Sequence, residues 1–164
     1  MARLGMRVVG IRDATRASLL ALDLPAGTSF DNPMDTPSGA LRMNDGHIAR
    51  PLLAAILGSE HPDAVLFHIN MPQFLTNPSI PDAVLDHLVD GMIEARRGDH
   101  DGTPIVLALR SDGSAAIDER KRAARDRALA CGVPVFDEIA GALRALSHFQ
   151  RFERFHRRVR ETPV

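Results

Sequence analysis

The chain contains neither tryptophan nor tyrosine, and its 164 residues include one cysteine and one lysine. Tryptophan and tyrosine are the residues that proteins use most for stacking on bases and sugars, so a stacking site of that kind is not expected. The single cysteine, Cys131, excludes an internal disulfide framework and suits a reducing cytoplasm. Cys131 precedes Gly132 at the end of an expected helix, a position typical of a small core residue and not of a nucleophile.

Long apolar runs and excess charge are also missing. No run is long enough to span a membrane, and residues 1–6 lack the apolar core of a signal peptide. The net charge is −1, so the chain as a whole has no electrostatic attraction to nucleic acid or to an anionic membrane. With 45% hydrophobic and 25% charged residues, the composition is that of one soluble globular domain. We therefore expect a cytoplasmic protein with no nucleic-acid partner and no membrane partner.

Three short apolar runs are the main positive signal, at Ala64–Ile69, Pro104–Leu109 and Val133–Phe136. Each run is followed by a segment with helical periodicity, which predicts an α/β fold with a parallel sheet covered by helices. A further strand is expected at Arg7–Ile11. A doubly wound domain normally opens with a strand and a glycine-rich turn, and both are missing here. The sequence therefore predicts an α/β domain without its first strand–helix unit.

Helices are expected between and after these strands. They are a short helix capped by Asp13, a helix over His47–Ser59, one opened by a capping box of Ser79 and Asp82, one over Ala115–Cys131, and a last one capped by Asp137. A long polar loop is expected over Pro25–Gly46, and a shorter loop over residues 70–78. The run Ala64–Ile69 is apolar on both faces, as in a central strand.

Two helices carry distinctive side-chain patterns. The helix over Ala115–Cys131 is expected to bury a narrow stripe formed by Ile117, Ala124, Ala128 and Leu129. After Leu146 the last helix changes character, because phenylalanines at 149, 152 and 155 alternate with arginines. Such a pattern can bind RNA or an anionic membrane. A helix that packs its phenylalanines on the domain or on a partner is favoured, because the chain has no excess positive charge. We therefore divide the chain into an α/β domain, 1–147, and a helical extension, 148–164.

One loop goes beyond a generic α/β pattern. Residues 24–35, LPAGTSFDNPMD, resemble the "LP…NPVD" loop of nucleoside-diphosphate-forming acyl-CoA synthetases. Further segments are similar to that family in order and spacing: PDAVL at 62–66, MPQ at 71–73, GVPVF at 132–136 and AGALRAL at 140–146. The similarity spans about residues 4–157 and concerns the flavodoxin-like domain related to the C-terminal part of the succinyl-CoA synthetase β subunit. Its most specific element is the Asn-Pro-X-Asp loop.

The resemblance implies a flavodoxin-like, Rossmann-type three-layer sandwich and a role in an acid–thiol ligase. Such a ligase joins a carboxylic acid to CoA at the expense of ATP or GTP, through an acyl phosphate and a phosphohistidine on another domain. In the family, a glycine-rich turn and a helix N-terminus face the phosphohistidine, and that unit is missing here. The CoA-binding, phosphohistidine and ATP-grasp domains are also missing from these residues. The resemblance thus implies a partial enzyme, with CoA and ATP or ADP bound by the complete assembly and no cofactor assigned to this chain.

No catalytic residue is assigned, but five residues are candidates for the substrate or phosphate pocket. Asn32, Pro33 and Asp35 lie in the long loop, where the resemblance has them shape the acyl-phosphate or phosphohistidine pocket. Local turn formation explains the same residues equally well. Pro72 and Gln73 follow the carboxyl end of a strand, the usual ligand position in a parallel sheet, although a structural turn is favoured there.

Two weaker candidates are an anion site and a metal site. Asp112, Gly113 and Ser114 precede a helix and could receive an anion, but an ordinary N-cap is favoured. No metal site is expected, because the histidines and their acidic neighbours lack the i,i+4 or paired Cys/His spacing of strong sites: Asp45, His47, His61, Asp63 and His68.

Two functions from different classes stay open. The chain is either a component of an acyl-CoA synthetase or a non-catalytic flavodoxin-like module that binds CoA, an acyl group or a protein. Without the first strand, Arg7–Ile11 must pair directly with Ala64–Ile69, borrow a strand from a second copy, or remain loose. An exposed apolar sheet edge favours association. We therefore expect a homodimer, or a chain completed by the missing ligase domains.

Overall fold

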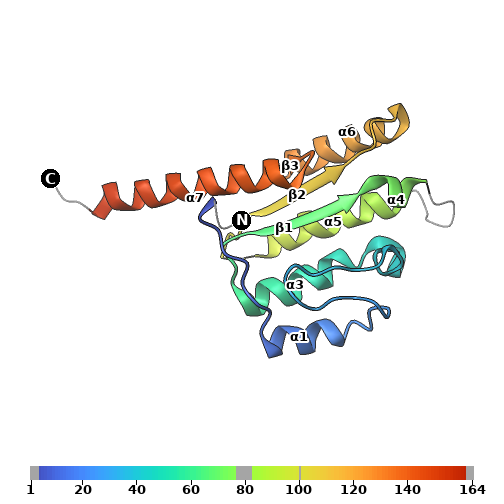
Figure 1. Cartoon of the computed structure of the whole chain (residues 1–164), viewed down its shortest axis with the longest axis horizontal. Coiled ribbons are helices and arrows are strands. Elements are labelled where there is room, and N and C mark those ends of the chain that lie inside the picture. Colours follow the sequence, from blue (N-terminus) through green and yellow to red (C-terminus); the bar gives the residue numbers. More distant parts are fainter. Residues whose placement is uncertain (1–3, 77–82, 100, 162–164) are drawn as a thin grey trace.

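A computed structural model describes residues 4–76, 83–99 and 101–161 of the chain. Its centre is a sheet of three parallel strands in the order β1 (Val65–Asn70), β2 (Ile105–Arg110) and β3 (Val135–Phe136) (Figure 1). The register aligns Val65 with Ile105 and Asn70 with Arg110. The expected α/β class and the three predicted parallel strands are thus confirmed.

Helices precede, connect and follow the strands. They are α1 (Asp13–Leu20), α2 (Ser38–Leu41), α3 (Ala49–Glu60), α4 (Met71–Leu75), α5 (Ala83–Gly98), α6 (Ala115–Ala130) and α7 (Ile139–Glu161), with a short 3-10 helix, η2, at Met43–Gly46. None of the described helices combines the length and the apolar composition that crossing a membrane requires.

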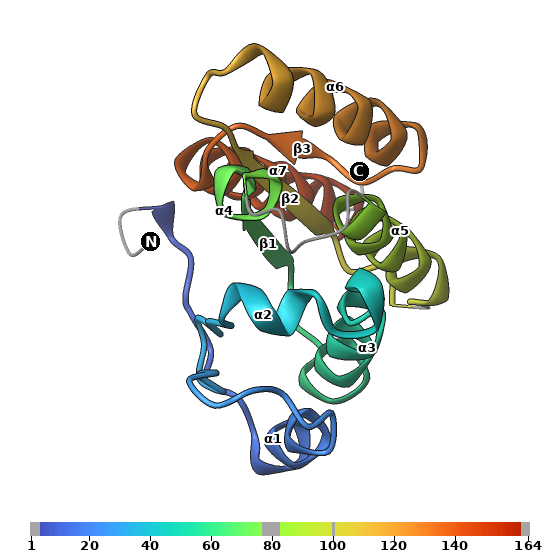
Figure 2. The same cartoon turned by 90° about the vertical axis from the view of Figure 1, so that its right-hand side faces the viewer.

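The helices lie in layers on the two faces of the sheet. On one face, α6, α5, α3 and α1 form a row, with each helix beside the next (Figure 2). On the other face, α7 packs Ala142 and Leu146 against Val106 of β2. The row of four helices extends beyond the strands, because α3 and α1 lie past the β1 side of the three-stranded sheet (Figures 1 and 2).

The main core lies between the sheet and the helix row. In β2, Ile105–Leu109 are at most 2% exposed, because both faces of this strand are covered. The inward face of α5 is the one that its helical spacing predicts, with Leu85, Leu88, Val89, Met92 and Ile93 buried. The apolar sequence of β1 predicted a central strand, but β1 lies at the edge of the described sheet. Among the described strands it pairs only with β2, and only its Ile69 is fully buried.

The predicted strand at Arg7–Ile11 is wrong. These residues belong to no helix or strand, and Val8 and Val9 are 41% and 37% exposed. A strand needs a neighbouring strand to satisfy its backbone, and none of the described strands lies beside this segment. Its contacts come instead from the side chain of Asn32, which donates a 2.8 Å hydrogen bond to the carbonyl of Val9.

Three local expectations also change, and a fourth is not tested. The loop expected at 70–78 contains α4, which begins directly after β1 and has Pro72 in its first turn, where proline is tolerated. Asp13 does not cap α1: Arg12 is the N-cap residue, and its side chain makes no capping hydrogen bond. Ile117, Ala124 and Ala128 form the buried stripe of α6, but Leu129 is 50% exposed. The capping box of Ser79 and Asp82 lies outside the described residues.

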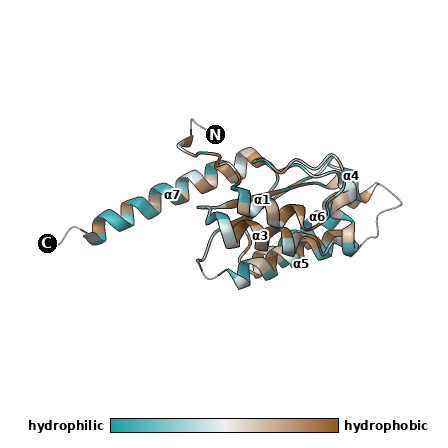
Figure 3. Cartoon of the chain, turned by 90° about the horizontal axis from the view of Figure 1, so that it is seen from below, coloured by the Kyte–Doolittle hydropathy of each residue, from teal (hydrophilic) through white to brown (hydrophobic). Residues whose placement is uncertain are grey.

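The last helix is continuous over 23 residues, and its burial changes along its length. Leu146 and Ser147 are buried, whereas every residue from Arg151 to Arg160 is exposed. The second half of α7 therefore projects from the body of the molecule (Figures 1 and 3).

Candidate functional site

The loop that carries Asn32, Pro33 and Asp35 is a compact turn closed by backbone contacts. The N–H of Ser29 donates a 2.8 Å hydrogen bond to the carbonyl of Asp35, which forms an isolated antiparallel bridge. The Asn32–Pro33 peptide is cis. Arg16 of α1 holds the loop through a 2.5 Å ion pair with Asp31.

The three candidate side chains of this loop are exposed. Asn32 uses its amide group to hold the N-terminal segment at Val9, so its donor has a structural partner. The carbonyl of Asp35 closes the turn, and its carboxylate lies at the surface. The loop thus forms the turn that its Asn, Pro and Asp residues predict, and it also leaves the carboxylate of Asp35 accessible to another molecule.

Pro72 and Gln73 lie at the carboxyl end of β1, as the sequence predicts. They form the first turn of α4, where the carbonyl of Pro72 accepts hydrogen bonds from the N–H and the hydroxyl of Thr76, at 3.1 and 2.6 Å. Pro72 is half-buried and Gln73 is exposed. Gln73 is therefore the polar group that this turn offers to a ligand.

The structure does not bring the two groups of candidates together. The Asn32 loop lies near α1, whereas α4 lies at the end of the sheet (Figure 1). Seen as in Figure 2, α2 lies between the loop and α4. The five candidates are thus two separate surface features and not one enclosed pocket.

The turn before α6 uses its polar groups internally. The carboxylate of Asp112 accepts a 2.9 Å hydrogen bond from the N–H of Ser114. The hydroxyl of Ser111 accepts one from the N–H of Gly113 and donates one to Asp118. The backbone N–H and then the hydroxyl of Ser114 hold the pKa of Asp112 below its usual range. Ser114 is the N-cap residue of α6, but its side chain makes no capping hydrogen bond, so the expected cap does not form. The polar groups of the turn bond within it, which favours a structural role over anion binding.

The histidines lie in separate places. The rings of His47 and His87 are stacked with centroids 4.2 Å apart, and Nδ1 of His87 lies 2.6 Å from the carbonyl oxygen of Asp45. His61 pairs with Asp101 at 2.9 Å. No cluster of three or more metal-ligating side chains occurs within residues 4–76, 83–99 and 101–161.

His68 marks the β1 edge. Its neighbours along the strand, Phe67 and Ile69, pack into the main core, whereas the His68 side chain is exposed on the opposite face. Although the ring is only partly covered, its desolvation lowers the pKa of His68; Glu138 opposes this shift and Arg110 adds to it. His68 is therefore an exposed titratable group on a strand at the edge of the described sheet.

A charged cluster links α6 to the start of α7. Asp137 accepts ion pairs from Lys121 at 2.9 Å and from Arg125 at 2.8 Å. The hydrogen bond from Lys121, followed by the charges of Arg125 and Lys121, holds the pKa of Asp137 below its usual range. The sequence predicted Asp137 as a helix cap, and the structure gives it these two partners from the preceding helix.

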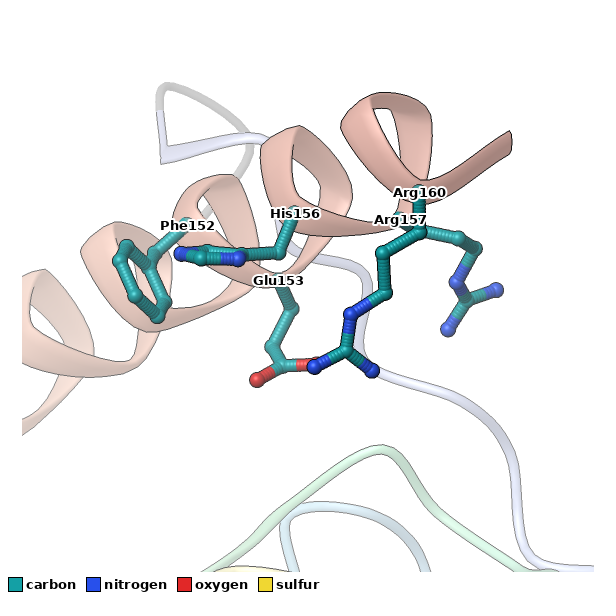
Figure 4. A pocket seen from close by; sticks show the side chains of 5 residues that line it. All are labelled: Phe152, Glu153, His156, Arg157 and Arg160. Atoms are coloured by element: carbon teal, nitrogen blue, oxygen red, sulfur yellow. The ribbon is translucent and has the colours of Figure 1, made fainter. Parts of the chain in front are cut away.

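A hollow lies beside the projecting half of α7 (Figure 4). Its lining side chains all come from this one helix: Phe152, Glu153, His156, Arg157 and Arg160. It is an open surface bounded by aromatic and charged groups, and it lies apart from the Asn32 loop and from α4.

These features were compared with known proteins. No family model matches the chain, and neither a curated protein nor a solved structure matches it.

Proposed function

We propose that this chain is one component of an acid–thiol ligase of the nucleoside-diphosphate-forming acyl-CoA synthetase type. It contributes part of the acyl-phosphate or phosphohistidine pocket and is inactive without the other domains. CoA and ATP or ADP then bind to the complete assembly.

The open edge of β1 is the observation that carries this proposal. A flavodoxin-like sheet has the order 2-1-3-4-5, and β1-β2-β3 fits its members 3-4-5. The next position beyond β1 then belongs to the first strand, the unit that the sequence lacks. The helix row continues past β1 through α3 and α1, so one face of that position is already covered (Figure 2).

The candidate residues fit an incomplete pocket. Asp35 and Gln73 are both exposed and lie on separate elements. Another domain that supplies the first strand and its glycine-rich turn would sit between the loop and α4. In this arrangement Asp35 and Gln73 contact the reacting groups only after assembly.

The test combines the chain with the missing parts of an acyl-CoA synthetase. The purified chain is mixed with an ATP-dependent synthetase of this type from which the flavodoxin-like domain has been deleted, and CoA-thioester formation is measured. Restored activity that falls at least tenfold with Asp35→Asn supports the proposal. Asp126→Asn, an exposed change on α6, is the matched control and should leave the restored activity unchanged. Failure to restore activity, in a mixture where both parts are folded, argues against it.

A non-catalytic module is the second candidate, and two contacts favour it. The hydrogen bonds from Asn32 to Val9 and from Ser147 to Leu4 hold the N-terminal segment without any added strand. A chain whose N-terminal segment is held in this way should unfold cooperatively alone. Thermal unfolding with and without CoA and ADP separates the candidates: a cooperative transition raised by CoA alone indicates a binding module, whereas a broad transition indifferent to both ligands indicates a ligase fragment.

A further inference from the structure

The projecting half of α7 carries a row of exposed apolar side chains. Phe149, Phe152, Phe155 and Val159, here called the phenylalanine stripe, are 49%, 57%, 62% and 56% exposed. Two further contacts make the row continuous, because the ring of His156 lies 4.3 Å from that of Phe152 and 5.9 Å from that of Phe155. Exposed apolar residues that gather on one side of a helix mark an interaction surface more than scattered ones do.

The phenylalanine stripe does not face the body of the protein. At 3.6 residues per turn, its four side chains span an arc of about 120° around α7. Ala142 and Leu146, which bury the first half of the helix, point about 80–120° away from the centre of that arc. The same rotation that seats α7 on the sheet therefore turns the centre of the stripe away from it, while Phe149, at one edge of the arc, lies about 20° from the direction of Ala142.

Arginines border the phenylalanine stripe on both sides, and Glu153 lies beside it on the Arg160 side. Arg151 and Arg160 lie on its two sides, each about 80–100° from its centre, and further arginines occupy the opposite side of the helix. Five arginines and two glutamates give residues 148–164 a charge of +3, which leaves −4 for residues 1–147. A segment of net positive charge thus projects from a body of net negative charge. Figure 3 shows how far the helix extends from the body.

We propose that the projecting half of α7 binds an anionic lipid surface. The helix lies in the membrane interface with the phenylalanine stripe among the acyl chains and Arg151 and Arg160 at the level of the headgroups. An apolar stripe bordered by arginines is the arrangement that interfacial helices use. Because the helix projects, the acidic body stays away from the negative surface while the basic segment reaches it.

The charge pattern and the width of the stripe favour lipid over other occupants. In a pair of identical helices, like-charged arginines would meet, and the seam between two helices is narrower than an arc of about 120°. Binding of single-stranded RNA combines aromatic side chains that stack on bases with nearby basic side chains that contact the phosphates. On α7 the phenylalanines lie on one side of the helix and most of the arginines lie on the other. This inference departs from the expectation that the chain has no membrane partner, because that expectation used the charge of the whole chain.

The test is sedimentation of the full chain with vesicles. Vesicles of phosphatidylcholine alone are compared with vesicles that contain about one-third phosphatidylserine, at low and at physiological salt. We expect binding to the anionic vesicles, at least tenfold weaker binding to the neutral ones, and weaker binding at the higher salt. The variant R151Q should bind the anionic vesicles about fivefold more weakly.

A second pair of variants tests the apolar contribution. The variant F149S/F152S/F155S should lose binding by at least tenfold, whereas L129S, which removes an equally exposed apolar side chain from α6, should bind like the unchanged chain. Circular dichroism checks that each variant is folded. Every changed residue is exposed, so the core is preserved.

Four outcomes overturn the proposal. They are absence of sedimentation with any vesicle, equal binding to neutral and anionic vesicles, stripe-dependent dimers of a chain that ignores vesicles, and stripe-dependent binding of a poly(U) RNA by a chain that ignores vesicles. Analytical ultracentrifugation without lipid detects the dimer. None of these readouts depends on ligase activity, so the inference is independent of the proposed function.

Discussion

The hydroxyl of Ser147 donates a 2.8 Å hydrogen bond to the backbone carbonyl of Leu4, and so joins the start of the described chain to the middle of α7. Ser147 is 7% exposed and lies where α7 leaves the body of the protein. The N-terminal segment pairs with none of the described strands. It is held by this contact, by the bond from Asn32 to Val9, and by the packing of Met6 and Ile11 on the core.

Removing the Ser147 hydroxyl should loosen the N-terminal segment. The variant S147A loses one partly buried hydrogen bond, so we expect a loss of about 1 kcal/mol in the free energy of unfolding. Hydrogen–deuterium exchange should also become faster in residues 5–11. Ser18→Ala, which removes an exposed hydroxyl bonded within α1, is the control and should leave that exchange unchanged. Equal exchange in S147A and the unchanged chain would show that the segment is held by other contacts.

Two glycines should respond in opposite directions to alanine. Gly46 has φ +93°, and a Cβ there would lie 2.6 Å from the carbonyl oxygen of Val84, so Gly46→Ala should cost about 2 kcal/mol or more. Gly58 lies in α3 with nothing within 4 Å of an added Cβ, so Gly58→Ala should stabilise the protein by about 0.5–1 kcal/mol. Denaturant titration measures both. Similar stability of the two variants would contradict the close packing of η2 on α5.

Asp137 should make the stability depend on acid pH. Its pKa is lowered in the folded protein, so its contribution is present above its ordinary pKa of about 3.9 and is lost as the pH falls through the lower, folded value. Because the side chain is 62% exposed, Asp137→Asn should cost at most about 1 kcal/mol at pH 7, and the difference should shrink toward pH 2. Denaturant titrations at several pH values measure this. In a Lys121→Ala background the effect of Asp137→Asn at pH 7 should be smaller.

His68 should report on the β1 edge. Its pKa is lowered, so the unfolded chain binds the proton more readily. The stability contributed by neutral His68 is therefore complete above about pH 6.5 and is lost as the pH falls through the folded pKa. An NMR titration of the His68 ring should give a value below 6.5. Addition of a domain that covers β1 should lower it further, and an unchanged value in a ligase-competent mixture would show that the edge stays open.

The elements predicted correctly are those whose pattern of apolar residues fits only one kind of secondary structure and one buried face. Ile105–Leu109 is apolar at every position and is the strand buried on both faces. The inward face of α5 follows from its helical spacing. The prediction of a strand at Arg7–Ile11 was wrong because a strand also needs a neighbouring strand to pair with. These residues have strand propensity, but none of the described strands pairs with them.

The candidate site was harder to predict than the fold. The local sequence predicts that Asp35 lies in a loop and that Gln73 follows the end of a strand. The distance between the two residues depends on how α1 and α2 pack. No local pattern contains that information. The partners of Asp137 were missed for a similar reason, because an aspartate before a helix predicts a cap, whereas Lys121 and Arg125 come from the preceding helix.

The opposite charges of the projecting helix and the body have a consequence for the molecule in solution. A chain of net charge −1 whose basic residues gather at one end has a large permanent electric dipole moment. Near its isoelectric point of about 6.6 it is almost uncharged overall and still presents one strongly cationic end. A cation exchanger should then retain the protein even at a pH where its net charge is close to zero. The bound molecules should all have the cationic end of α7 directed toward the resin.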